Sequence, residues 1–343
     1  MELILTAEEI EMENSRILLA SDSLISLLAY PNNISGSRLK DLILADPLPK
    51  EDIDIHILKN RNIRLISEEI QIGRAIFINR ATLRYLPTTQ TFYTSKIREE
   101  NVATELSYAT PALILHTSLD KEWHYIQSYF YRGWIEKKNL LLLDESSFQD
   151  FIAPKKYIII TTPGKINEID LDMGIKLPLL AIHDSFYEVL LPGPEIAHIP
   201  IDKAHIGYMP YTKENIIAQA YKYLDTSYRW GGTGGGIDCS LLIVNIFKTF
   251  GLLFPRDTSC QEDVIGIHNI CLKGHTEEEK KEILMQLPTP FILFKPGHVL
   301  LGIESDTVLH AYGDAGKVFI SKLEDSCGTN LYPYLTSVSL LYK

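Results

Sequence analysis

The stretch that most limits how this chain can fold is YRWGGTGGGIDCS, at residues 228–240, which holds five glycines between positions 231 and 236. Glycine adopts positive φ angles without steric cost and lets the backbone pass close to a ligand. Asp238 can cap a helix, so that Cys239 would lie in the first helical turn. The predicted helix runs through SLLIVNIFKTF and ends before Gly251, a residue typical of the position after a helix. The stretch therefore predicts a loop that delivers a cysteine to the start of a helix.

A cysteine in this position has the properties of a nucleophile. A helix N-terminus carries roughly half a positive charge, which would stabilise a thiolate and lower the pKa of Cys239. The free N–H groups of the first turn can hold an oxyanion. The glycines would then build a slot for substrate backbone beside the sulfur.

Two histidines downstream can serve this cysteine as proton partners. The runs GHVLLGIE and TVLHAYG predict the strands of a hairpin with Ser-Asp at its turn, which places His298 and His310 on neighbouring strands. One would act as general base, and the other would orient its ring. This is the arrangement of papain-like peptidases. For either histidine the alternative is a residue satisfied in the core or exposed on the surface.

Three changes of pattern divide the rest of the chain. Residues 1–84 predict a partly helical segment, with an amphipathic helix in SRLKDLILAD and a second helix over SEEIQIGRAIFIN, capped by Ser67. Residues from about 85 to 207 contain short β-rich runs between turn residues, typical of one or two small barrels. After residue 208, Thr212 is expected to cap a helix that precedes the glycine loop.

Composition excludes several classes of partner. The chain has 343 residues and a net charge of −11, so neither a nucleic acid nor an anionic membrane is expected to bind it. No apolar run reaches the roughly 20 residues that span a bilayer. The first residues lack the basic region of a signal peptide. We therefore expect a cytoplasmic protein, or else a trimmed form of a periplasmic or secreted one.

The other cysteines and charged runs predict structure rather than chemistry. Four cysteines are too few for a disulfide framework, and Cys260 and Cys327 are expected to be small buried residues. Cys260, His268, Cys271 and His275 fit no common zinc spacing, so no metal and no cofactor are expected. The run TEEEKKEIL predicts a solvated helix face.

The order of the motifs resembles the NlpC/P60 family of papain-like cysteine peptidases. The matching runs are YRWGGTGGGIDCS, FGLLFPRDTSCQ, PGHVLLGIE and VLHAYG. The resemblance implies Cys239 as nucleophile, His298 as general base and His310 as the orienting residue. It also implies that the substrate slot is lined by Tyr228, Asp238, Ser240 and Asp257. The chain departs from the family pattern at Leu241, where a glycine often follows the serine.

The resemblance extends upstream of this domain. The run TPALILHTSLDKEWHYIQSYFYRGWIEKKNLLL is similar to the bacterial SH3-like barrels of multi-domain members, chiefly through Trp123 and the Gly133-Trp134-Ile135 run. In such relatives an aromatic side chain of the first barrel closes one end of the groove, and Tyr129 or Tyr131 is the candidate.

The expected fold class is α+β: a papain-like catalytic domain preceded by two small SH3-like β-barrels and a partly helical N-terminal segment. The expected boundaries are 1–84 for the N-terminal segment, 85–143 and 144–207 for the two barrels, and 208–343 for the catalytic domain.

Three functions remain open from the sequence. The resemblance implies a cysteine endopeptidase that cleaves the γ-D-glutamyl–diamino acid bond of murein peptides, with a preference for short peptides that have a free N-terminal L-Ala. The same Cys-His machinery would also serve an amidase or an acyltransferase. A catalytically idle wall-binding protein is the third possibility, against which the intact set of Cys239, His298 and His310 argues.

Overall fold

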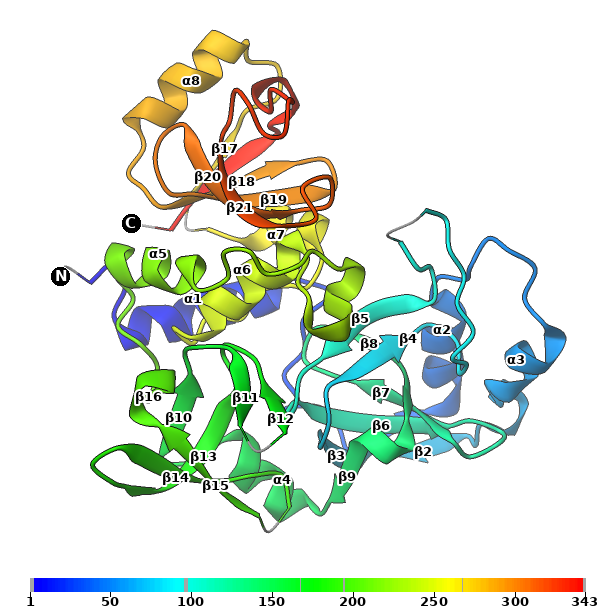
Figure 1. The fold of residues 1–343 in the computed structure, drawn as a ribbon. Coiled ribbons are helices and arrows are strands. Elements are labelled where there is room, and N and C mark those ends of the chain that lie inside the picture. The colour runs from blue at the N-terminus through cyan, green and yellow to red at the C-terminus, as the bar shows by residue number, and fades with distance from the viewer. Residues whose placement is uncertain (1–2, 96–97, 167, 194, 267, 342–343) are drawn as a thin grey trace. The chain divides into compact units, whose positions relative to one another are not determined.

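The computed structural model describes residues 3–95, 98–166, 168–193, 195–266 and 268–341 (Figure 1). The chain divides into two compact units. One unit joins Met1–Leu24 to Tyr208–Lys343, and the other is Ile25–Gly207. None of the helices formed by the described residues combines the length and the apolar character that crossing a membrane requires.

The first barrel of the Ile25–Gly207 unit is a seven-stranded antiparallel sheet in the order β5-β4-β8-β7-β6-β3-β9. Its strands are β3 (Gly73–Phe77), β4 (Ala81–Arg84), β5 (Val102–Leu106), β6 (Pro111–Thr117), β7 (Trp123–Gln127), β8 (Arg132–Glu136) and β9 (Leu140–Leu143). Trp123 and Trp134 are buried in its core together with Tyr125. The predicted Trp and Gly-Trp-Ile signature therefore marks the centre of the barrel.

The prediction of a helix that begins after Ser67 is wrong. This stretch forms strands β2 (Glu69–Gln71) and β3, and β3 pairs with both β6 and β9. Ile70, Ile72 and Arg74 alternate with more exposed neighbours, whereas residues 75–77 are all buried, and pairing on both sides of β3 decides the outcome. The sheet of the first barrel thus takes in β3 and β4, which lie before the boundary expected at residue 85.

The N-terminal segment also supplies short elements around this barrel. They are β1 (Asn33–Ser35), α2 (Gly36–Ala45) and α3 (Ile55–Asn60), whereas α4 (Glu145–Ile152) follows the barrel. Helix α2 is the amphipathic helix predicted in SRLKDLILAD, and it buries Leu39 and Ile43. Strand β1 pairs with β2.

The second barrel is a five-stranded sheet in the order β15-β14-β13-β10-β16, accompanied by a β11–β12 hairpin. Its strands are β10 (Tyr157–Ile160), β11 (Gly164–Ile166), β12 (Ile169–Leu171), β13 (Lys176–Ile182), β14 (Phe186–Leu190), β15 (Ile196–Pro200) and β16 (Ala204–Ile206). Its buried core includes Ile158, Leu177 and Val189.

The other unit is built on a six-stranded antiparallel sheet in the order β17-β22-β18-β19-β20-β21. Its strands are β17 (His268–Cys271), β18 (Phe291–Lys295), β19 (His298–Gly302), β20 (Thr307–Tyr312), β21 (Lys317–Lys322) and β22 (Ser337–Leu340). Its helices are α1 (Ala7–Ala20), α5 (Lys213–Tyr221), α6 (Cys239–Lys248), α7 (Thr258–Val264) and α8 (Glu277–Gln286). The predicted α6, the Thr212 cap of α5 and the β19–β20 hairpin are all present.

Helix α1 belongs to this unit although it lies at the start of the chain. The Asn14 amide donates to the Gly251 carbonyl and accepts from the Leu253 N–H, each at 2.8 Å. Arg16 donates to the Val264 carbonyl at 2.5 Å. The N-terminal helix therefore fixes the segment that follows α6.

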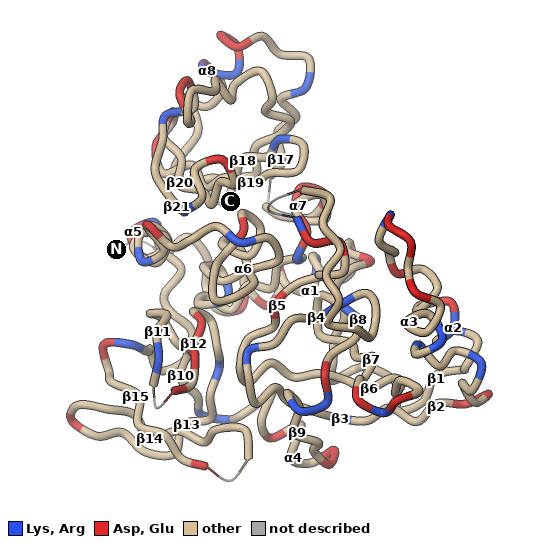
Figure 2. The backbone as a smooth tube through the Cα atoms, turned by 45° about the vertical axis from the view of Figure 1, so that its right-hand side comes forward, with Lys and Arg blue, Asp and Glu red and all other residues tan. Residues whose placement is uncertain are grey.

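Helix α8 is the predicted charged helix, with acidic and basic residues mixed along it (Figure 2). The expectation that this helix presents its charged residues to solvent is wrong in part, because Lys280 is only 3% exposed. Its ammonium donates to the carbonyls of Tyr332, Pro333 and Leu335 at 2.9, 3.2 and 3.0 Å. Lys280 thus ties α8 to the turn before β22 instead of facing solvent.

Candidate active site

The glycine loop has the conformation for which its sequence is suited. Gly231, Gly232, Gly234 and Gly235 have φ angles of 68°, 75°, 62° and 75°, which are strained for other residues. At Gly232 an added Cβ would also lie 2.4 Å from a side-chain carbon of Leu241. The loop therefore packs directly on the first turn of α6.

Helix α6 begins at Cys239, as predicted. Asp238 is its N-cap and accepts a hydrogen bond from the Leu241 N–H at 2.9 Å. Cys239 is 7% exposed. Its sulfur lies 3.7 Å from the Thr258 hydroxyl oxygen, and the backbone N–H of Val299 is near enough to lower the pKa of the thiol. Because Val299 is next to His298, the loop and the β18–β19 hairpin bring the predicted nucleophile and base to one place.

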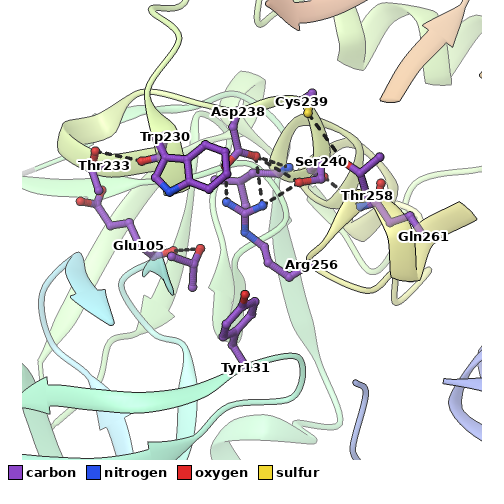
Figure 3. Close-up of polar contacts among 12 residues, drawn as sticks. Glu105, Tyr131, Trp230, Thr233, Asp238, Cys239, Ser240, Arg256, Thr258 and Gln261 are labelled. Atoms are coloured by element: carbon purple, nitrogen blue, oxygen red, sulfur yellow. Dashed lines mark hydrogen bonds and ion pairs between the residues drawn. The ribbon is translucent and has the colours of Figure 1, made fainter. Parts of the chain in front are cut away.

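A buried ion pair holds the start of α6 (Figure 3). Arg256 donates to the two carboxylate oxygens of Asp238 at 2.5 and 3.0 Å, and to the Ser240 hydroxyl at 2.8 Å. Gln261 donates to the carbonyls of Ser240 and Pro255 at 3.1 and 2.8 Å. Asp238 and Ser240, which were expected to line the substrate slot, are buried and engaged in this network.

Arg256 and Gln261 are positioning residues that the candidate set from the sequence did not include. The signal that would have found them is their place in the PRDTSCQ run, on either side of Thr258. Both are buried beneath the first turn of α6. The run therefore holds the start of the helix that carries Cys239.

The two predicted histidines form a hydrogen-bonded pair. His298 Nε2 lies 2.8 Å from His310 Nδ1, and His310 Nε2 lies 3.3 Å from the hydroxyls of both Ser321 and Ser326. His310 is completely buried, and His298 nearly so. Since Nε2 of His298 faces His310, its Nδ1 is the nitrogen left to act on another group. The two serines were not among the sequence candidates, and no motif marks them.

The electrostatics of the cysteine differ from the prediction. Burial, and then the nearby Asp238 carboxylate, raise the pKa of the Cys239 thiol, so the expected lowering by the helix N-terminus is outweighed. Burial, His310 and Lys295 hold the pKa of His298 well below 6.5, and burial lowers the pKa of His310 to about 3. At neutral pH the resting pair is therefore an uncharged thiol and an uncharged imidazole.

The remaining candidates fall in different places. Tyr228 is half-buried, and burial followed by the proximity of Cys239 raises the pKa of its phenol, so it borders the thiol. Asp257 is exposed at the N-cap of α7. Tyr129 and Tyr131 belong to the barrel unit, where the Tyr131 hydroxyl lies 3.1 Å from that of Tyr85. Their proposed place at the groove end stays a prediction.

The accessory cysteines are not buried as expected. Cys260 is half-buried on α7, and Cys327 is exposed in a turn with a φ angle of 53°. A short helix on the surface and a tight turn leave both without a core to enter. Among the residues that the structure describes, no group of three His, Cys, Asp or Glu side chains is arranged to hold a metal ion.

Comparison with known families agrees with this geometry. Residues 225–332 match the NlpC/P60 family, and residues 99–136 match the SH3 domain of the SH3b1 type. The part of the chain that carries Cys239, His298 and His310 is therefore a domain of the NlpC/P60 family, whose peptidases are cysteine hydrolases, and an SH3-type domain precedes it.

Individual relatives extend the comparison. Dipeptidyl-peptidase 6 of Lysinibacillus sphaericus is 25% identical over 242 residues, which cover 64% of this chain and 84% of that protein. The γ-D-glutamyl-L-lysine dipeptidyl-peptidase of Bacillus subtilis is 30% identical over 133 residues, 38% of this chain and less than half of that protein, at 45%.

Solved structures share the fold. An NlpC/P60 endopeptidase from Photobacterium damselae subsp. piscicida superimposes with a TM-score of 0.76 at 19% identity, covering 99% of this chain and 94% of that one. An NlpC/P60 family protein from Bacillus cereus gives a TM-score of 0.60 at 16% identity, covering 79% and 100%. The α+β architecture, with a papain-like domain preceded by SH3-like barrels, is the one predicted.

Proposed function

We propose that this protein is a cysteine endopeptidase that hydrolyses the γ-D-glutamyl–diamino acid bond of murein peptides. The observation that carries the proposal is the position of Cys239 on the first turn of α6, with the Val299 N–H near its sulfur and, next to Val299 on β19, the His298 that pairs with His310. Nucleophile, base and orienting group are then the three that a covalent hydrolysis needs.

The first half-reaction begins from neutral groups. His298 Nδ1 takes the proton of the thiol as Cys239 Sγ attacks the γ-carbonyl carbon of D-glutamate. His298 Nε2–H meanwhile donates to His310 Nδ1, and His310 Nε2–H donates to the Ser321 and Ser326 hydroxyls. This chain of hydrogen bonds fixes the ring and stabilises the imidazolium. Backbone N–H groups at the start of α6 hold the oxyanion.

Loss of the leaving group completes the first half-reaction, and hydrolysis of the acyl-enzyme is the second. The imidazolium of His298 gives its proton to the leaving nitrogen, the C–N bond breaks, and a thioester joins Cys239 to the γ-carboxyl group. Water then attacks the thioester, with His298 as base, and releases the D-glutamyl acid and the thiol. No cofactor takes part in either step.

The substrate assignment draws on the relatives. One of them is named for γ-D-glutamyl-L-lysine bonds, and the family match over residues 225–332 includes Cys239. We propose that short peptides with a free N-terminal L-Ala are the substrates, with Asp257 near the amine. A cytoplasmic protein that recycles freed peptides is the biological setting that fits such substrates.

Mass spectrometry of L-Ala-γ-D-Glu-L-Lys incubated with the purified chain tests the proposal. We expect L-Ala-D-Glu and free lysine from the wild type, and none from Cys239→Ala or His298→Ala variants that keep their far-ultraviolet circular dichroism. Cys327→Ala, which alters an exposed cysteine, is the matched control and should retain full activity. An active Cys239→Ala variant would remove the proposal, and transfer of the acyl group to added amines in place of water would favour an acyltransferase.

A further inference from the structure

Lys295 extends a row of side chains across the sheet beside the candidate base. Lys295 pairs with His298 in the β18–β19 hairpin, and opposed residues of an antiparallel pair point to the same face. The Lys295 ammonium lies 6.0 Å from the ring centroid of Tyr312, and the Tyr312 and His298 ring centroids are 5.3 Å apart. A half-buried cation therefore flanks the imidazole, and no carboxylate among the described residues forms an ion pair with it.

Asp314 adds a carboxylate whose charge reaches Lys295. It is exposed in the turn between β20 and β21, two residues after Tyr312, and it helps to raise the pKa of the Tyr312 phenol, after burial. Its charge acts on both Lys295 and Tyr228. The Tyr228 N–H donates to the Gly316 carbonyl at 2.8 Å, which ties this turn to the start of the glycine loop. Lys295 and Asp314, which we call the charged rim, thus offer one cation and one anion near Cys239.

A cation beside His298 opposes the first chemical step. His298 must become an imidazolium when it takes the thiol proton, and the charge of Lys295 lowers the pKa of both His298 and His310. Like charges repel more strongly in a buried site than in water. An anion bound to Lys295 would offset this repulsion as the imidazolium forms, so the substrate itself can complete the site.

We propose that Lys295 and Asp314 form the subsite for the leaving diamino acid, with its α-carboxylate on Lys295 and its side-chain ammonium on Asp314. The inference rests on the proposed function and names what binds on the leaving side of that site. His298 gives its proton to the leaving nitrogen, so the atoms attached to that nitrogen lie beside His298 and its neighbour Lys295. A diamino acid with a free carboxylate carries both of the charges that this rim complements.

Four peptides and four proteins test the subsite. The peptides are L-Ala-γ-D-Glu-L-Lys, its C-terminal carboxamide, its Nε-acetyl derivative, and the analogue with D-isoglutamine in place of D-glutamate. The proteins are the wild type, Lys295→Met, Asp314→Asn and the control Lys273→Met, which alters an exposed lysine outside the site. The values of kcat and KM are measured on the pH plateau, because loss of Lys295 also changes the pKa of His298.

The expected pattern is specific to charge recognition on the leaving side. The wild type should lose about tenfold in kcat/KM when the carboxylate becomes a carboxamide, as for one charge-assisted contact in a half-exposed site. Most of the loss should be in kcat, because the contact matters when the imidazolium forms. Lys295→Met should lose this preference and cleave the carboxamide at least as fast as the wild type. Asp314→Asn should lose a roughly threefold preference for the free ε-amine, and Lys273→Met should match the wild type.

Two results would overturn the subsite. One is a Lys295→Met variant that keeps the wild-type preference for the carboxylate. The other is a variant that instead loses discrimination against D-isoglutamine, since Lys295 would then read the acyl side. If the wild type cleaves none of the four peptides, the proposed function fails and the subsite fails with it. If the wild type cleaves the peptides and Lys295→Met leaves the substrate preferences unchanged, the subsite is refuted while the proposed function is not.

Discussion

Replacing Arg256 by methionine should destabilise the catalytic unit strongly. Arg256 and Asp238 are 3% and 8% exposed at their side chains, and the pair is bidentate, at 2.5 and 3.0 Å. Removing one partner leaves a buried carboxylate without its counter-charge, which costs about 3–5 kcal/mol. At about 2–4 °C per kcal/mol for a unit of this size, the melting temperature should fall by roughly 6–20 °C.

Calorimetry of the full chain measures the loss of stability. Labelling of the buried Cys239 thiol shows that the loss belongs to the unit that contains this residue. Peptide mass spectrometry reports the urea concentration at which Cys239 becomes reactive, separately from the exposed cysteines. The double variant Asp238→Asn/Arg256→Met should recover much of the loss, because asparagine still caps a helix and no charge is left unpaired. Lys273→Met is the control.

The reasoning would be refuted if Arg256→Met cost less than about 1 kcal/mol, the range of an exposed ion pair. It would also fail if the double variant were less stable than Arg256→Met alone. Either result would mean that the Asp238 carboxylate finds water or another donor when the guanidinium is removed. The start of α6 would then be held by the glycine loop and not by the ion pair.

Four further predictions concern protonation and the loop. The acid limb of kcat/KM should lie well below pH 6.5, because His298 stays a free base down to its lowered pKa; a limb at or above 6.5 would contradict this. Iodoacetamide should alkylate Cys239 slowly at pH 7 and faster above pH 9, because burial raises its pKa from 9.0; rapid labelling at pH 6 would indicate an ion pair. The pKa of His310 is 6.5 when exposed and about 3 when folded, so the unfolded chain takes up a proton first and stability falls from pH 6.5 toward 3, by up to about 1.4 kcal/mol per pH unit; urea midpoints should show this slope, and His310→Asn should reduce it. Gly232→Ala should lower the melting temperature more than Gly234→Ala, since both have positive φ angles but only at 232 does the new Cβ meet a side-chain carbon, at 2.4 Å; equal melting temperatures would refute the packing argument.

Local signals were enough to predict the elements that carry the candidate site. The Asp238 cap, the α6 helix and the β19–β20 hairpin each depend on residues close together in the chain, and each is present. The predicted helix at Ser67 failed because β3 is decided by pairing with β6 and β9, which come much later in the sequence. Likewise, nothing in the run TEEEKKEIL reveals that Lys280 meets three carbonyls about fifty residues away.

Protonation was the least predictable property of the site for the same reason. The position of Cys239 at a helix start is a local fact, and it favours a thiolate. The burial that opposes the thiolate comes from the whole domain, and the Asp238 carboxylate adds to it, while Val299, Thr258 and Arg256 act in the opposite direction without outweighing it. Sequence therefore predicts which groups meet, while tertiary structure decides where their protons lie.

A neutral resting pair changes where the free energy of activation arises. When the thiol is already ionised, charge separation precedes substrate binding. Under the mechanism we propose, the proton moves only as Cys239 attacks, so the imidazolium of His298 and the oxyanion form together, in a site that also holds the cation of Lys295. Groups that stabilise the imidazolium at that moment, whether His310 on one side or a substrate carboxylate on the other, then act on kcat more than on binding. A peptide that lacks such a carboxylate would occupy the site and still react slowly, which makes the charge of the substrate a means of selection during the chemical step.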